Sequence, residues 1–328
     1  MTKKITIIFG AGASYALKEI DDNFKKEKNL NPPLTKDLFD SRFSKSIMDW
    51  TKLSIEHQSI QNWLKNNDYD LEKYIQELNN NIKLKNEVRY YLKKLLTYIS
   101  NNYLSKKEIS YFYKFIQRLN NLEDCNSAII NLNYDLFLDF AYNDLILEKQ
   151  PNDINDYWYN AKIKHFKPHG SVNWVRVEKK NKLDEKFKDH NPQENFKAKP
   201  DHKIYLETEL NGDEIDQYNQ HAVIGLPIEE EKEIIYTEME KVIKQSTKNS
   251  DLIVIIGWSG KDQDIINVIK DASNENKKTR IIICSPNNPK TTLDNLNLEK
   301  VNLNNKITKK VCFSEIATND KTFAEIFS

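Results

Sequence analysis

The chain has 328 residues, and its 49 Lys and Arg residues balance 49 Asp and Glu. This balance excludes the global basic field that attracts nucleic acid, so no direct nucleic-acid binding is expected. Three widely spaced cysteines form no C-x-x-C pair, which argues against a disulfide framework and a cysteine zinc site, so we expect no metal. The longest uncharged apolar run, residues 252–258, is far shorter than the ~20 residues of a membrane span. These features predict a cytoplasmic protein that does not bind membranes.

The first third of the chain begins with a strand and continues as helices. Residues 5–9 are β-branched and almost wholly apolar, which is typical of a buried strand. A helix is expected to begin near residue 13, and two prolines make residues 31–34 a loop. Apolar side chains then recur at helical spacing as far as residue 121, with neither glycine nor proline. Residues 40–121 are therefore predicted to form a helical subdomain inserted after the first strand.

Strands and helices alternate in the rest of the chain. A helical period covers residues 229–248. Strand-like apolar runs occupy residues 127–132, 163–166, 251–256 and 280–284. This alternation predicts an α/β fold, in which a Rossmann-like parallel sheet carries helices on both faces. Residues 178–203 are densely charged and are predicted to form a solvated surface excursion.

Glycine is scarce in this chain, and its positions are informative. There are 7 Gly where an average usage of about 7% would give roughly three times as many. One group, Gly10-Ala11-Gly12-Ala13-Ser14, follows the first strand, where glycines let backbone N–H groups and a helix N-terminus approach a diphosphate. The third glycine of the usual dinucleotide fingerprint is missing. A tight turn between strand and helix would show the same pattern.

A polar cluster, Asn131-Leu132-Asn133-Tyr134-Asp135, follows the predicted strand at residues 127–132. Ligands of open α/β sheets bind outside the carboxyl ends of the strands, so these side chains are well placed to contact a ribose. Helix capping is the alternative, because Asn and Asp are favoured N-cap residues. Asp135 would then cap a helix and leave Asn133 to the ligand.

Two further strand ends carry side chains suited to chemistry. His169 stands beside Gly170, and histidine is the side chain best suited to proton transfer near neutral pH. A single histidine at a strand end is more often structural, and its interpretation here depends on the other strand-end motifs. Gly257 and Ser259 follow the strand at residues 251–256, with acidic residues directly after them.

With these segments in this order, the chain resembles the sirtuin, or silent-information-regulator, superfamily. More narrowly, it resembles the bacterial sirtuin-like effectors of anti-phage defence. The similar segments are residues 10–14, 32–39, 131–135, 167–174 and 256–259. The resemblance implies a single domain spanning residues 1–328.

The resemblance also implies a role for each matching residue. Asn133 would contact the nicotinamide ribose of NAD+ and position a water molecule, and His169 would be the catalytic histidine. Asp135 would support the loop that carries Asn133. The other residues would bind NAD+: Gly10, Ala11, Gly12, Ala13 and Ser14 at the diphosphate, Gly257 and Ser259 at the adenosine half, and Asn287 at the adenine ribose.

The implied activity is hydrolysis of NAD+ to nicotinamide and ADP-ribose, which would deplete cellular NAD+ in abortive infection. Sirtuin deacylases carry a four-cysteine zinc module between the His-Gly motif and the Gly-x-Ser motif, whereas this interval contains no cysteine. Protein deacylation is therefore a weaker alternative. A catalytically silent subunit that binds NAD+ or ADP-ribose, and a structural subunit, are further alternatives.

An unrestrained NAD+ hydrolase would kill its own cell, so its activity must be controlled. In the family that the chain resembles, the activity is controlled by oligomerisation, by a fused sensor domain or by a partner protein. We therefore expect a homo-oligomer, a partner defence protein such as an ATPase or an Argonaute-like protein, or both.

Overall fold

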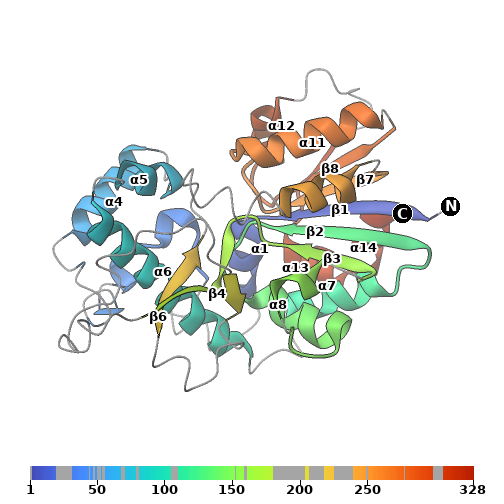
Figure 1. The fold of residues 1–328 in the computed structure, drawn as a ribbon. Coiled ribbons are helices and arrows are strands. Elements are labelled where there is room, and N and C mark those ends of the chain that lie inside the picture. The colour runs from blue at the N-terminus through green and yellow to red at the C-terminus, as the bar shows by residue number, and fades with distance from the viewer. Residues whose placement is uncertain are drawn as a thin grey trace.

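The computed structural model of the protein describes residues 2–19, 32–43, 45–46, 49, 53, 56–67, 71–78, 81–104, 110–151, 153–158, 161–179, 204–206, 218–224, 239–248, 250–276, 278–297 and 306–328. Its central element is a six-stranded sheet in which all neighbouring strands run parallel (Figure 1). The strands lie in the spatial order β3 (Ile163–Phe166), β2 (Cys125–Asn131), β1 (Lys3–Phe9), β7 (Leu252–Ile256), β8 (Arg280–Cys284) and β9 (Lys306–Lys309).

The inner strands of this sheet are the segments whose sequence is short and apolar. All five residues of β7 are buried, as are the last five of β1. Such burial on both faces suits a parallel sheet. The predicted α/β fold with a parallel sheet is thus confirmed, and β3 and β8 have the predicted bounds. Strand β9 was not predicted, because it has only four residues, begins and ends with lysine, and exposes its two middle residues at the sheet edge.

Helices cover both faces of the sheet, as predicted (Figure 1). One face carries α7 (Tyr111–Asn120), α8 (Phe137–Tyr142), α13 (Phe313–Thr318) and α14 (Asp320–Phe327), and the other carries α11 (Gln263–Glu275) and α12 (Pro289–Leu296). At the end of β1, the ring of Phe9 packs against Phe112, Phe115 and Phe313, at centroid distances of 5.7, 5.4 and 5.2 Å. Through these ring contacts α7 and α13 pack against the carboxyl end of β1.

The expected helical subdomain at residues 40–121 divides into two parts. Helices α4 (His57–Asn66), α5 (Leu71–Glu77) and α6 (Ile82–Leu104) lie to one side of the main sheet, whereas α7 belongs to the layer that covers it (Figure 1). Helix α6 contacts a second, antiparallel sheet, which was not predicted. Its strands lie in the order β5 (Ile204–Leu206), β4 (Gly170–Lys179) and β6 (Tyr218–Ile224).

Two other predicted segments are only partly described. Of the predicted helix at residues 229–248, residues 239–247 are helical, and the first part lies outside the described residues. The charged excursion predicted at residues 178–203 overlaps the end of β4, and its residues 180–203 lie outside the described part. None of the described helices combines the length and the apolar character that crossing a bilayer requires.

The topology of the main sheet places a binding site at its middle. Numbered along the chain, the six strands of this sheet lie in the order 3-2-1-4-5-6, so the order reverses between β1 and β7. Open α/β sheets bind ligands outside the carboxyl ends of their strands at this reversal. The carboxyl end of β1 leads into α1 (Ala11–Tyr15), and that of β7 leads through a glycine turn into α11.

Candidate functional site

A cavity of about 470 Å³ opens at this reversal, which is within the range of small-molecule sites. The apolar side chains of Leu34, Leu38, Leu71 and Leu96 border it on the helical side. Most of the predicted site residues line the cavity, namely Gly10, Ala11, Gly12, Asn133, Asp135, His169, Gly257 and Ser259. Ala13, Ser14 and Asn287 are not among the lining residues. Ala13 and Ser14 are buried behind the turn, and Asn287 is exposed after β8.

The two glycine turns that form the floor of the cavity pack directly on each other. The Gly12 N–H donates to the Gly257 carbonyl at 2.9 Å, and the Gly10 N–H donates to the Ile256 carbonyl at 3.0 Å. A Cβ at Gly257 would lie 2.4 Å from the Ala13 nitrogen, and the φ of Gly257 is +64°. These glycines are therefore required for the close contact between the turns, whereas the sequence indicated an approach to a diphosphate or a tight turn within one segment. The N–H groups of Gly10 and Gly12 are occupied by this contact.

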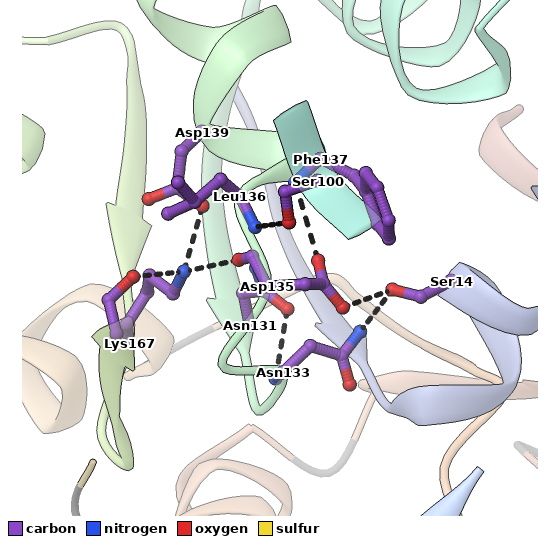
Figure 2. A network of polar contacts seen from close by, with 10 residues as sticks. Ser14, Ser100, Asn131, Asn133, Asp135, Leu136, Phe137, Asp139 and Lys167 are labelled. Atoms are coloured by element: carbon purple, nitrogen blue, oxygen red, sulfur yellow. Dashed lines mark hydrogen bonds and ion pairs between the residues drawn. The ribbon is translucent and has the colours of Figure 1, made fainter. Parts of the chain in front are cut away.

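The side chain of Asn133 is held in one orientation. Its amide nitrogen donates to the Gly10 carbonyl and to Ser14 Oγ, each at 3.1 Å. Its backbone N–H donates to Asn131 Oδ1 at 3.1 Å. Because both amide hydrogens are engaged, the amide oxygen is the part of the side chain left to act on a ligand, and Figure 2 shows it pointing away from the network.

Asp135 borders the same cavity, but its side chain is buried and its carboxylate is engaged by neighbouring groups of the protein. Its carboxylate accepts hydrogen bonds from Ser14 Oγ at 2.7 Å and from the Phe137 N–H at 3.3 Å. Burial raises the pKa of Asp135 to about 6, against the opposing effects of the Lys167 charge and these hydrogen bonds. Asp135 thus orients Ser14, which in turn orients Asn133.

A buried lysine joins the two loops that carry Asn133 and His169. Lys167 Nζ donates to the Asp135 carbonyl at 2.7 Å and to Asp139 Oδ2 at 2.8 Å (Figure 2). It also donates to Ser171 Oγ at 2.7 Å. The side chains of Lys167 and Asp139 are each only 2% exposed, and a buried ammonium requires such complete pairing. Sequence reasoning missed this role, although a lysine directly before the Pro-His-Gly segment was a visible signal.

His169 lies in the turn between β3 and β4 and meets an acidic partner from another element. Its Nε2 is 2.7 Å from Asp262 Oδ2, and the two side chains are 15% and 13% exposed. The Tyr134 ring makes an edge contact with His169 at a centroid distance of 6.3 Å. Sequence reasoning noted acidic residues after the Gly257 turn but gave Asp262 no role.

The pKa of Asp262 is lowered, in keeping with its contact with His169. Burial by itself would raise the pKa of Asp262, but the hydrogen bond and charge of His169, with two backbone N–H donors, lower it below the ordinary value. Asp262 is therefore a carboxylate at neutral pH. Among the described residues, no group of three or more His, Cys, Asp or Glu is arranged as a metal site would require.

Comparison with known proteins agrees with the expected superfamily. The family model of the SIR2-like domain matches residues 127–306, which is more than half of the chain. A search of the curated proteins finds no match.

Solved structures of Sir2 proteins are similar at low identity. A Sir2 homologue in complex with NAD shares 13% identity, with a TM-score of 0.45, over 99% of this chain and 89% of that chain. A Sir2 homologue mutant in complex with ADP-ribose shares 11% identity, with a TM-score of 0.46, over 99% and 92%. Sir2 bound to an acetylated peptide shares 12% identity, with a TM-score of 0.44, over 99% and 94%. On the match to the family model, the chain belongs to the SIR2-like domain family.

Proposed function

We propose that this protein binds NAD+ in the cavity between β1 and β7 and hydrolyses it to nicotinamide and ADP-ribose. The observation that carries the proposal is the convergence of Asn133 and His169, from two separate loops, on one cavity at the reversal of the sheet. Membership of the SIR2-like family supports NAD+ as the substrate.

The reaction demands little from the protein at the leaving group. Water attacks C1′ of the nicotinamide ribose, the C1′–N bond breaks, and its electron pair neutralises the pyridinium nitrogen of nicotinamide. The transition state resembles the oxocarbenium ion of glycoside hydrolysis. The protein therefore has to hold the ribose, orient the water and accept one proton, which is finally released to solvent.

The two side chains suit these tasks. The oriented amide oxygen of Asn133 can accept a hydrogen bond from the attacking water or from a ribose hydroxyl. His169 can accept a proton from the water or from the ribose, a contribution typically worth about 10²–10⁴-fold in rate.

The binding roles of the other predicted residues belong to this proposal. The turn at residues 10–14 would lie against the diphosphate, with the exposed side chains of Lys36 and Lys261 at the rim of the cavity supplying positive charge. Gly257 and Ser259 would contact the adenosine half. Asn287 would contact the adenine ribose at the edge of the site, since it is not one of the residues that line the cavity. The resemblance to anti-phage effectors suggests the setting, namely depletion of NAD+ by a homo-oligomer or a complex with an ATPase or an Argonaute-like protein.

The test is release of nicotinamide from NAD+ by the purified chain. We expect His169→Ala and Asn133→Ala each to lower turnover by about 10²-fold or more, with an unchanged circular dichroism spectrum. Asn126→Ala, at an exposed position near the start of β2, is the matched control and should retain full activity.

Absence of NAD+ binding in a titration would refute the proposal. Binding without release of nicotinamide would refute hydrolysis by the isolated chain and favour a subunit that needs an activator. Turnover that requires an acyl-lysine peptide would instead favour deacylation.

A further inference from the structure

We propose that Asp262 is a positioning residue, which holds the His169 ring in one orientation and one tautomer through the contact between His169 Nε2 and Asp262 Oδ2. This inference rests on the proposed function of His169, and it adds a residue to which the sequence motifs assigned no role. The turn after β7 thereby contributes to the reaction itself, as well as to the shape of the cavity.

The geometry gives each oxygen of the Asp262 carboxylate a separate partner. Oδ1 accepts the N–H groups of Asp264 at 2.9 Å and Ile265 at 3.2 Å, which makes Asp262 the N-cap of α11. Oδ2 contacts His169 Nε2 at 2.7 Å. The cap bonds fix the carboxylate to the first turn of a helix whose apolar side packs into the core. A rigid element therefore carries the partner of a residue that lies in a loop.

The contact also selects which nitrogen of His169 carries a proton. A carboxylate accepts hydrogen bonds and cannot donate them, so the Nε2 that faces it must carry hydrogen. The basic nitrogen of the neutral ring is then Nδ1. When Nδ1 takes a proton, the nearby negative charge stabilises the resulting imidazolium, as in other His–carboxylate pairs.

Other charged or titratable groups of the described residues also lie near His169. Lys36, Tyr134, Asp135 and Lys261 line the same cavity. Asp135 is buried and hydrogen-bonded to Ser14, and Lys167, two residues before His169, is paired with Asp139. Lysine side chains offer donors to a ring nitrogen, whereas the observed contact at Nε2 is made by an acceptor. Within the described part of the chain, Asp262 places a carboxylate oxygen 2.7 Å from His169 Nε2.

Two substitutions separate this role from the capping role. Asn and Ser are both good N-cap residues, so Asp262→Asn and Asp262→Ser should keep α11 intact. An Asn amide at this position can present N–H to the ring, which favours the opposite tautomer, whereas Ser is too short to reach it. Asn288→Ala is the matched control, because it removes the N-cap of the neighbouring α12 without touching His169.

The primary readout is the ¹⁵N chemical shifts of the His169 ring in histidine-labelled full-length protein. The signal is assigned by its loss in His169→Gln. We expect the Nε2–H tautomer in the wild type and a loss of that preference in Asp262→Asn, with no change in Asn288→Ala. This measurement does not need turnover, so it tests the positioning role even if NAD+ hydrolysis is not observed.

The second readout is steady-state hydrolysis of NAD+. We expect Asp262→Asn to lower kcat by about 10²-fold, within the range for general acid–base catalysis, with a small change in KM and an unfolding midpoint near that of the wild type. Unchanged ring shifts and unchanged kcat in Asp262→Asn would overturn the proposal. A wild type that fails to hydrolyse NAD+, while Asp262→Asn still alters the tautomer, would refute hydrolysis by the isolated chain and leave the positioning role standing.

Discussion

The contact between the two glycine turns can be tested by adding a single methyl group. Gly257→Ala places a Cβ 2.4 Å from the Ala13 nitrogen and 2.6 Å from the Gly12 carbonyl carbon, at a residue whose φ is +64°. The substitution combines two costs, a left-handed backbone for an L-residue and an overlap with the backbone of the neighbouring turn. Two other glycines separate these costs.

Gly10→Ala imposes the overlap alone. Its Cβ would lie 2.6 Å from Trp258 Cα, whereas its φ of −118° is ordinary for alanine. Gly260→Ala imposes mainly the backbone cost, since its φ is +74° and its nearest contact, the Thr292 carbonyl oxygen, is 3.1 Å away.

The expected magnitudes follow from these two terms. A left-handed L-residue costs roughly 1–2 kcal/mol, overpacking costs about 1–3 kcal/mol, and the loss of glycine freedom in the unfolded chain returns about 0.4–1 kcal/mol. Gly257→Ala should therefore lower the free energy of unfolding by about 1–5 kcal/mol. Gly10→Ala and Gly260→Ala should each cost clearly less.

Urea denaturation of the three variants measures these differences, and an NAD+ titration shows whether the cavity survives. We expect Gly257→Ala and Gly10→Ala to weaken NAD+ binding, because separation of the turns moves the floor of the cavity. Gly260→Ala, which does not line the cavity, should bind normally. If Gly257→Ala is no more destabilising than Gly260→Ala, the two turns do not need their close contact and the reasoning fails.

Three predictions concern the buried network in Figure 2. Because the pKa of Asp135 is raised from 3.8 to about 6, the native state binds more protons than the unfolded state between these values. The free energy of unfolding of the wild type should therefore fall by roughly 2 kcal/mol, relative to that of Asp135→Asn, as the pH rises from 4 to 7. Urea denaturation at the two pH values measures this, and the same pH dependence in both proteins would contradict it. Lys167→Met leaves the carboxylate of Asp139 buried without a cation and should cost about 3–5 kcal/mol, and recovery of much of this loss by adding Asp139→Leu, measured by thermal unfolding, checks the cause. Ser14→Ala removes hydrogen bonds to both Asp135 and the Asn133 amide and should cost about 1–3 kcal/mol and slow nicotinamide release; a wild-type rate would show that the orientation of Asn133 does not depend on Ser14.

Local patterns in the sequence were sufficient to predict the inner strands of the main sheet and the polar residues that follow them. Residues 252–256 and 281–283 are continuous apolar runs rich in β-branched residues, and such short runs are typical of strands buried on both faces. The polar residues that follow these runs stand out because the strand before them has almost none. Asn133 and His169 could be named as candidates before any coordinates were known, because each closely follows a predicted strand, at residues 127–132 and 163–166.

The division of the helices could not be predicted in the same way. Helix α7 has the same periodicity as α4 and α6, yet it covers the main sheet, because Phe112 and Phe115 fit against Phe9 and Phe313. Helical periodicity shows that a helix has an apolar face but does not say which surface that face will meet. The antiparallel sheet around β4 depends likewise on pairing between distant segments.

The sequence by itself therefore determined the α/β class, the inner strands, and the positions along the chain where polar chemistry follows a strand. Tertiary structure alone decided which of these positions meet. It set the strand order that places β1 beside β7, the close contact that requires Gly10 and Gly257, and the pairing of His169 with Asp262 across 93 residues of chain. The physical reason is how far apart in the sequence the contacting residues lie. Strand and helix patterns arise from neighbours within a few residues, whereas contacts between loops depend on how separate elements pack, and no local pattern encodes that packing.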